Sequence, residues 1–90
     1  MSDVRGTLDE RRSTYGHYEE VARLTRKMLA ACESTVGWKG LEAPFQESIH
    51  MILSKLARIV NGDPYHADSW HDVAGYATLA ERYAKGEREL

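Results

Sequence analysis

The chain has 90 residues, a length that predicts a single domain over residues 1–90 with a modest core. Its 12 basic and 14 acidic residues give a net charge of −2, which argues against a general binder of nucleic acid polymers. No apolar run approaches the roughly 20 residues that span a bilayer, and residues 1–5 lack the apolar stretch of a signal peptide. We therefore expect a cytoplasmic protein without a membrane partner, and the single cysteine, Cys32, is in keeping with a reducing compartment.

The first two predicted helices lie before Gly37. A short helix over about residues 8–13 follows Thr7, which has capping-box spacing to Glu10, and Tyr15-Gly16 ends it. A longer helix begins near His17. Its apolar residues recur at steps of three and four, which predicts one buried stripe made of Tyr18, Val21, Ala22, Leu24, Met28, Leu29, Cys32 and Val36.

Two more helices are predicted after Gly37, over residues 44–61 and about 69–85. The first, about 27 Å long, has Pro44 in its first turn and ends at Asn61-Gly62, where glycine readily takes a left-handed conformation. Ser69 and Asp72 resemble a capping box for the second. The predicted apolar faces are Phe45, Ile49, Ile52, Leu53, Leu56, Ile59 and Val60 in the first helix, and Trp70, Val73, Ala74, Ala77 and Ala80 in the second.

Short loops between the three long helices predict an all-α, antiparallel bundle of three main helices plus the short N-terminal helix. No segment shows the two-residue alternation of a strand. Several apolar residues exceed what one thin core can cover, namely Met28, Met51, Leu53, Tyr76, Leu79 and Tyr83. We therefore expect a homo-oligomer.

The polar side of the helix over 44–61 is a first candidate site. Glu47, His50, Ser54, Lys55 and Arg58 project near one another at steps of three and four. Lys55 and Arg58 could bind a phosphate, the arginine in bidentate fashion. A solvated helix face with an ordinary charge pattern is the alternative interpretation.

A second candidate site is the polar stretch over residues 63–72. Asp72, one turn into the last helix, could face Lys55 or Arg58 and hold the basic side chain by a charge-assisted hydrogen bond. The alternative is that Asp68 or Ser69 caps the helix while Trp70 packs in the core. His66 and His71 lie nearby, but the stretch lacks a convincing set of metal ligands, so no metal is expected.

A third candidate site is the segment from Arg11 to His17. An exposed Tyr15 could stack on a base, Arg11 could bind a phosphate, and Gly16 lets the backbone approach a ligand. The alternative is a turn whose tyrosine plugs the core. The sequence contains no nucleophile–base–acid signature and no phosphate-binding glycine loop, so no catalytic residue is assigned.

Together these segments form the pattern R-x-x-x-Y-G, later K-x-x-R, later D-S-W-x-D-x-A-G-Y-A, which covers nearly the whole chain. The pattern resembles a family of small phage proteins similar to anti-CBASS nucleotide sponges. That resemblance implies a non-enzymatic protein that sequesters a cyclic nucleotide immune signal, such as 3',3'-cGAMP or a related cyclic dinucleotide, in pockets between protomers. It implies no cofactor, and it implies nucleotide contacts from Arg11, Tyr15, Gly16 and His17. Combined with the candidate sites above, the predicted ligand-binding residues also include Lys55 and Arg58 as phosphate ligands, Trp70 and Tyr76 as further stacking rings, and Asp68 and Asp72.

A more remote resemblance connects the chain with MazG-like all-helical nucleotide pyrophosphatases, which hold magnesium with E-x-x-E and E-x-x-D. The chain departs from this pattern in both motifs. Ser69 stands in place of the first Glu of E-x-x-D, and His50, three residues after Glu47, stands in place of the second Glu of E-x-x-E. A magnesium-dependent pyrophosphohydrolase using Glu47, Asp68 and Asp72 is therefore the alternative function. A helical adaptor that binds a partner through an exposed stripe is the third possibility.

Overall fold

The computed structural model describes residues 4–87, and every element of regular structure in that range is helical. The helices are α1 (Val4–Tyr15), α2 (Tyr18–Glu33), the 3-10 helix η1 (Val36–Gly40), α3 (Ala43–Asn61) and α4 (Ala67–Ala84). The predicted all-α fold is therefore confirmed. None of these helices is both long and apolar enough to cross a membrane.

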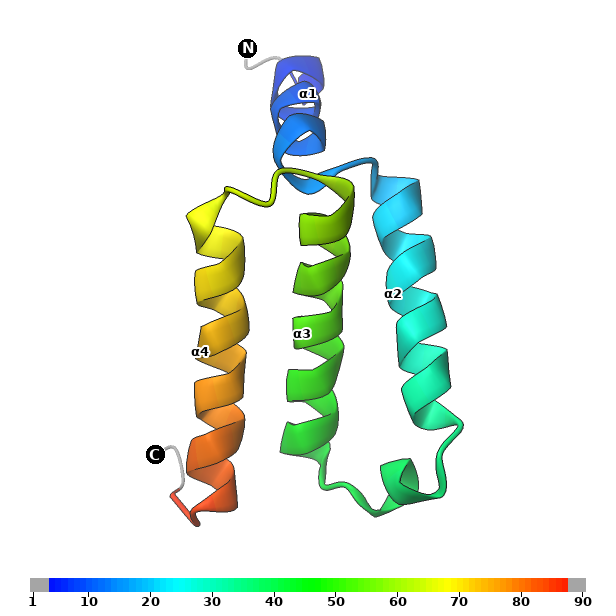
Figure 1. The fold of residues 1–90 in the computed structure, drawn as a ribbon, viewed down its shortest axis with the longest axis vertical. Helices are drawn as coiled ribbons and strands as arrows, with labels where there is room; N and C mark the ends of the chain where they lie inside the picture. Colours follow the sequence, from blue (N-terminus) through cyan, green and yellow to red (C-terminus); the bar gives the residue numbers. More distant parts are fainter. Residues whose placement is uncertain (1–3, 88–90) are drawn as a thin grey trace.

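The three long helices lie side by side in a row, with α3 in the middle (Figure 1). Helix α3 runs antiparallel to both neighbours and packs against each of them, whereas α2 and α4 have almost no contact with each other. Helix α1 projects beyond one end of the row, and η1 lies at the other end between α2 and α3. The predicted antiparallel neighbours are correct, and the row leaves both broad sides of α3 only partly covered.

The helix boundaries confirm some predictions and correct others. Helix α3 ends at Asn61 as expected, but Gly62 has φ −125° and ψ −133°, so the predicted left-handed conformation is wrong. Helix α1 begins at Val4, which puts Thr7 inside the helix rather than at a capping box. Helix α4 begins two residues earlier than Ser69, with His66 at its N-cap and no side-chain cap, so the second capping box is also wrong.

The buried core is small and includes three hydroxyl side chains. Its members are Val21, Leu29, Ala57 and Ile59 together with Thr25, Ser48 and Ser69. The Thr25 hydroxyl donates a hydrogen bond of 2.8 Å to the carbonyl oxygen of Val21, which satisfies it inside the core. No large side chain of the described residues is completely buried, so this single chain leaves much of its apolar surface in water.

Six residues predicted to be buried are instead exposed, among them Ala74 and Ala77 of α4. Tyr18 is 86% exposed, Val36 97%, Val60 72% and Trp70 49%. Val36 lies in η1, because α2 ends at Glu33 and does not carry its stripe that far. Tyr18 lies on α2, and Trp70 and the two alanines lie on α4; each of these helices packs against α3 on one side. Val60 lies on α3, whose apolar surface exceeds what its two neighbours cover.

Two glycine-containing turns meet where α1 joins the row. A Cβ atom on Gly16, whose φ is +86°, would lie 2.4 Å from the carbonyl oxygen of Asn61, and one on Gly62 would lie 2.2 Å from the carbonyl oxygen of Thr14. The backbone N–H of Asp63 donates a 2.8 Å hydrogen bond to that Thr14 oxygen. We call Thr14, Gly16, Asn61, Gly62 and Asp63 the glycine joint. Only glycine lets the two backbones approach this closely, and the contact fixes the end of α1 on the end of α3.

Candidate functional site

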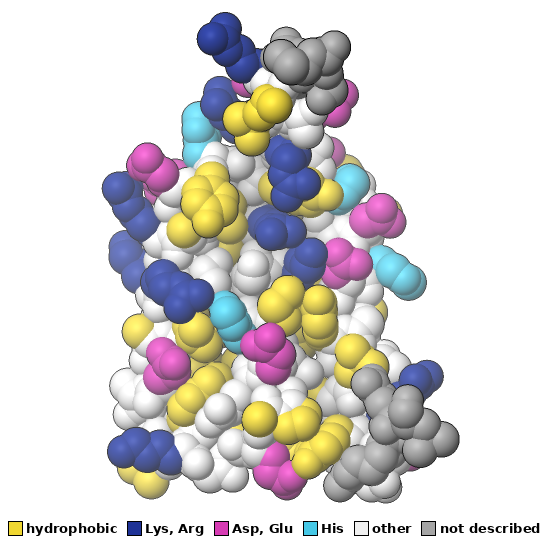
Figure 2. Space-filling view, turned by 180° about the vertical axis from the view of Figure 1, so that it is seen from behind, with side chains coloured by type: hydrophobic (Ala, Val, Ile, Leu, Met, Phe, Trp, Pro, Cys, Tyr) yellow, Lys and Arg dark blue, Asp and Glu magenta, His cyan; other side chains and the backbone are white. Residues whose placement is uncertain are grey.

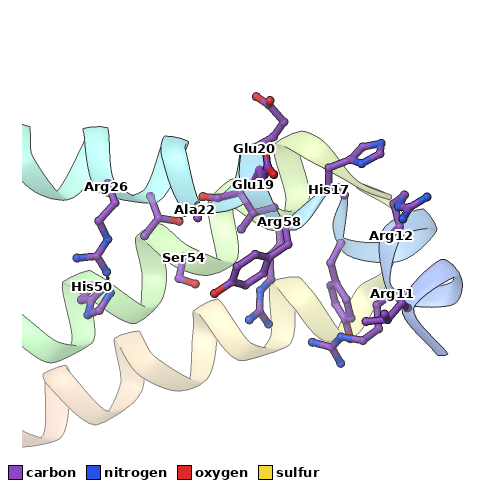
Figure 3. A pocket seen from close by; sticks show the side chains of 16 residues that line it. Arg11, Arg12, His17, Glu19, Glu20, Ala22, Arg26, His50, Ser54 and Arg58 are labelled. Atoms are coloured by element: carbon purple, nitrogen blue, oxygen red, sulfur yellow. Dashed lines mark hydrogen bonds between the residues drawn. The ribbon is translucent and has the colours of Figure 1, made fainter. Parts of the chain in front are cut away.

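A cavity of about 940 Å³ lies next to the glycine joint. Three helices and the turn between α1 and α2 contribute its walls. Its lining includes Arg11, Arg12, Tyr15, Gly16, His17, Tyr18, Glu19, Glu20, Ala22, Thr25, Arg26, His50, Ser54 and Arg58. We refer to this cavity as the pocket, and Figure 3 shows it from close by.

Tyr15 organises one end of the pocket. The guanidinium carbons of Arg11 and Arg58 lie 5.1 Å and 5.4 Å from the centre of its ring. The ring also meets His66 edge-on at 5.4 Å, with 3.5 Å between the Tyr15 hydroxyl and Nε2 of His66. Cation–π attraction therefore holds two arginines from different helices beside one half-buried tyrosine. The glycine joint makes this possible, because it brings α1 against the end of α3.

The charge at this end of the pocket is not neutralised within the described residues. Glu19 and Glu20 pair with Arg23, at 3.7 Å and 3.5 Å. Arg12 has a longer contact of 3.8 Å with Asp9, and no carboxylate in residues 4–87 pairs with Arg11 or Arg58. Figure 2 shows Lys and Arg side chains gathered in the upper middle of this side. These two guanidinium groups are therefore available to an anion.

A second basic group lies at the far end of the pocket. The guanidinium of Arg26 is 3.2 Å from Nε2 of His50, and Nδ1 of His50 is 3.5 Å from the Glu47 carboxylate (Figure 3 labels Arg26 and His50). Because an arginine only donates, Nε2 of His50 is the acceptor of the Arg26 contact. Ser54 lies between the two basic ends and offers a hydroxyl without a charge.

The structure brings half of the predicted site residues together. Five of them line the pocket: Arg11, Tyr15, Gly16, His17 and Arg58. The remaining five do not line it: Lys55, Asp68, Trp70, Asp72 and Tyr76. The expected pairing of Asp72 with Lys55 is present, with 3.1 Å between carboxylate and ammonium. Trp70 is not in the core, and its indole N–H donates a 2.8 Å hydrogen bond to the carbonyl oxygen of Pro64.

None of the α2 residues that line the pocket is among the predicted site residues, and Tyr18 and Arg26 offer the most to a ligand. Tyr18 was assigned to the buried stripe but lines the pocket and is almost fully exposed. Arg26 was assigned no role. Tyr18, Ala22 and Arg26 are four residues apart, so they share one side of α2, and this spacing was a signal that the sequence did contain.

The pocket contains no obvious centre for metal chemistry. Among residues 4–87, no three His, Cys, Asp or Glu side chains converge in a way that could hold a metal ion. The groups present are guanidinium ions, phenol rings, imidazoles, hydroxyls and two carboxylates that pair with Arg23. Such groups can bind phosphate oxygens and flat rings.

Comparison with known proteins places the chain in a family but not beside a characterised relative. No curated protein and no solved structure matches the sequence. One family profile matches residues 4–84, which cover α1 to α4 and the whole pocket. The chain therefore belongs to the family described as Domain of unknown function (DUF6378).

Proposed function

We propose that the protein binds and sequesters a cyclic nucleotide signal, such as 3',3'-cGAMP or a related cyclic dinucleotide, without cleaving it. The observation that carries this proposal is the pair of arginines, Arg11 and Arg58, which lie beside Tyr15 in the pocket and have no acidic partner among residues 4–87. The pocket volume of about 940 Å³ lies at the upper end of the range of about 300–1,000 Å³ for small-molecule sites. That size suits a ligand larger than a mononucleotide.

Arg11 and Arg58 are the proposed phosphate ligands. A guanidinium presents its donors in a fixed fork that matches two phosphate oxygens, and hydrogen bonds of this kind are about twice as strong as neutral ones. Contact with the Tyr15 ring restricts both side chains before a ligand arrives, which lowers the entropy lost on binding. Arg26 at the far end could bind a second phosphate, as a dinucleotide requires.

Tyr18 is the proposed base-stacking residue of a single chain. Its ring is 86% exposed and lines the pocket, whereas the ring of Tyr15 already has two guanidinium groups beside it. A base can stack on an exposed phenol ring without displacing anything. Ligand contacts from Asp68, Trp70, Asp72 or Tyr76 would require a pocket shared between copies, as the resemblance to sponges implies.

The proposal of binding without hydrolysis rests on the chemistry of the pocket. A magnesium-dependent pyrophosphohydrolase needs several carboxylates that converge on the metal. The two carboxylates of the pocket, Glu19 and Glu20, both point toward Arg23. We therefore propose a phage-type anti-defence protein that acts in the bacterial cytoplasm by removing an immune signal from solution.

The direct test is to incubate the protein with a panel of cyclic and linear nucleotides, denature it by heat and identify what is released. We expect release of an intact cyclic dinucleotide and binding that survives EDTA. Release of a monophosphate or pyrophosphate, or binding that is lost on chelation and restored by magnesium, would move the assignment to a pyrophosphohydrolase. No binding of any nucleotide would leave the adaptor interpretation.

An arginine substitution tests the proposed phosphate contact. Arg58→Ala removes a charge-assisted hydrogen bond that contributes about 1.5–3 kcal/mol, so the affinity for the cyclic dinucleotide should fall tenfold or more. Arg82→Ala, in the last turn of α4 and outside the pocket, is the matched control and should bind as the parent does. Equal affinities for Arg58→Ala and the parent would remove Arg58 from the site.

A further inference from the structure

The far end of the pocket contains a histidine that two cavities share. A second cavity, of about 400 Å³, meets the pocket at His50, and among residues 4–87 no other residue lines both. The second cavity is lined by Glu33 and Glu47, whereas the pocket beside His50 is lined by Arg26. The imidazole therefore lies between a cation on one side and carboxylates on the other.

The two ring nitrogens of His50 face these opposite charges. Nε2 lies 3.2 Å from the Arg26 guanidinium, and Nδ1 lies 3.5 Å from the Glu47 carboxylate. Because arginine has no acceptor, the Arg26 contact forms only while Nε2 carries no proton. The imidazole side chain is 32% exposed, so the ring can exchange protons with water.

The charged groups that face the imidazole come from two helices. Helix α2 contributes Arg26 and Glu33, and α3 itself contributes Glu47 and, further along the pocket, Arg58. The 3-10 helix η1 adds only the uncharged Trp38 to the cavity walls, α4 adds no residue to either cavity, and α1 lines the other end of the pocket.

Arg26 has no acidic partner of its own. No carboxylate in residues 4–87 pairs with it, and its guanidinium contacts the ring of His50 instead (Figure 3). Hydrogen bonds from a guanidinium to an anion are stronger than those to a neutral acceptor. An anion that enters this end of the pocket can therefore take the place of the imidazole on Arg26.

We propose that Arg26 and His50 form a proton-linked phosphate subsite, an inference that rests on the proposed function for the identity of the anion. When a phosphate oxygen accepts from the Arg26 guanidinium, Nε2 of His50 loses its donor, takes a proton from water and donates to the same phosphate. The anion favours the protonated ring, and the Glu47 carboxylate compensates the new charge from the Nδ1 side.

Ligand affinity should therefore depend on pH in one direction. Binding takes up a proton, so the affinity rises as the pH falls through the range in which histidine titrates. A phosphodiester stays ionised throughout that range, so the dependence comes from the protein and not from the ligand. For 3',3'-cGAMP we expect about tenfold tighter binding at pH ~6 than at pH ~8. Calorimetry in two buffers of different ionisation enthalpy should show the proton uptake directly.

Histidine variants locate the proton. His50→Gln keeps an acceptor for the Arg26 guanidinium but takes up no proton, so its affinity should be the same at both pH values. His71→Gln, on α4 and outside both cavities, is the matched control and should keep the tenfold difference. His17→Gln, at the other end of the pocket, should keep it too. A pH dependence that is absent from the parent, persists in His50→Gln or disappears in His17→Gln would overturn the proposal.

A probe without a nucleotide separates this subsite from the proposed function. Sulfate is a dianion over the same pH range, and an NMR titration at constant ionic strength, followed at the Arg26 and His50 signals, measures its affinity. Sulfate should bind the parent about tenfold more tightly at pH ~6 than at pH ~8, and His50→Gln equally at both. No response at these signals, or equal affinities in the parent, would overturn the subsite even if cyclic dinucleotides bind. The expected sulfate response without any nucleotide binding would retain the subsite and reject the proposed function.

Discussion

The two sides of α3 are made from the same nineteen residues but offer opposite chemistry. One side carries His50, Ser54 and Arg58 and forms a wall of the pocket. The other carries Ile52 and Leu56 and is aliphatic and partly exposed. Both sides are open because α3 lies in the middle of a row rather than inside a closed bundle.

The two sides of α3 differ in how many other elements are required to build them. The apolar side is complete with α3 alone, because its residues follow one another along a single helix. The pocket side depends on α1 and on the turn before α2, which the glycine joint holds against the end of α3. Damage to the joint should therefore affect the pocket side of α3 far more than its apolar side. The following predictions test that difference.

The largest effect is expected from Gly16→Ala. The new Cβ would lie 2.4 Å from the Asn61 carbonyl oxygen, an overlap that costs about 1–3 kcal/mol, and the φ of +86° adds about 1–2 kcal/mol for a residue with a side chain. Thermal unfolding should show a clear loss of stability, and calorimetry should show that nucleotide binding is lost.

Gly75→Ala is the matched control for this change. Nothing lies within 4 Å of a Cβ at Gly75, which is inside α4, so alanine should stabilise the helix by up to about 1 kcal/mol. If Gly16→Ala melts at the temperature of the parent and binds nucleotide normally, the glycine joint does not build the pocket.

A smaller effect, confined to binding, is expected from Tyr18→Ala. Loss of base stacking costs about 1–3 kcal/mol, so the affinity should fall about fivefold to 150-fold. The melting temperature should hardly change, since the ring is 86% exposed. Tyr65→Ala is the control, because Tyr65 is 92% exposed and does not line the pocket. Similar affinities for the two variants would show that Tyr18 does not touch the ligand.

The smallest effect is expected at the ion pair between α3 and α4. Lys55 is mostly covered and Asp72 is nearly half-exposed, so their 3.1 Å contact should stabilise the fold by about 1 kcal/mol or less. A double-mutant cycle with Lys55→Met and Asp72→Asn measures that coupling by denaturant unfolding. Since neither residue lines the pocket of a single chain, both variants should bind nucleotide within a few-fold of the parent. A tenfold loss would instead indicate a ligand site that includes this pair.

The spacing of apolar residues made the long helices predictable, and proline and glycine residues placed the two ends of α3. The stripe from Phe45 to Val60 and the punctuation by Pro44 and Gly62 located α3 to within one residue. Capping patterns were less informative. Thr7 and Ser69 both have the right spacing to an acidic residue, yet each lies inside a helix, because three-residue spacing also recurs within any helix.

The candidate site was only partly predictable, because a pocket needs residues from several elements. Arg11, Tyr15 and Arg58 were identified separately, and their contact depends on the glycine joint, which forms between turns more than forty residues apart. The prediction that Tyr18 is buried is wrong. Its spacing fits the apolar stripe of α2, but spacing cannot tell whether a neighbouring helix extends far enough to cover the first turn of α2.

By itself the sequence determined that this protein is helical, where its long helices run, and that Asp72 could meet Lys55, because these follow from spacing along a single helix and from short connections. Only the tertiary structure decided that the helices form a row, that Gly16 and Gly62 are packing glycines, and that Trp70 and Tyr18 are exposed. The physical reason is that burial depends on what covers a side chain. In a row of three helices, part of the apolar surface of the outer helices has no neighbour among residues 4–87.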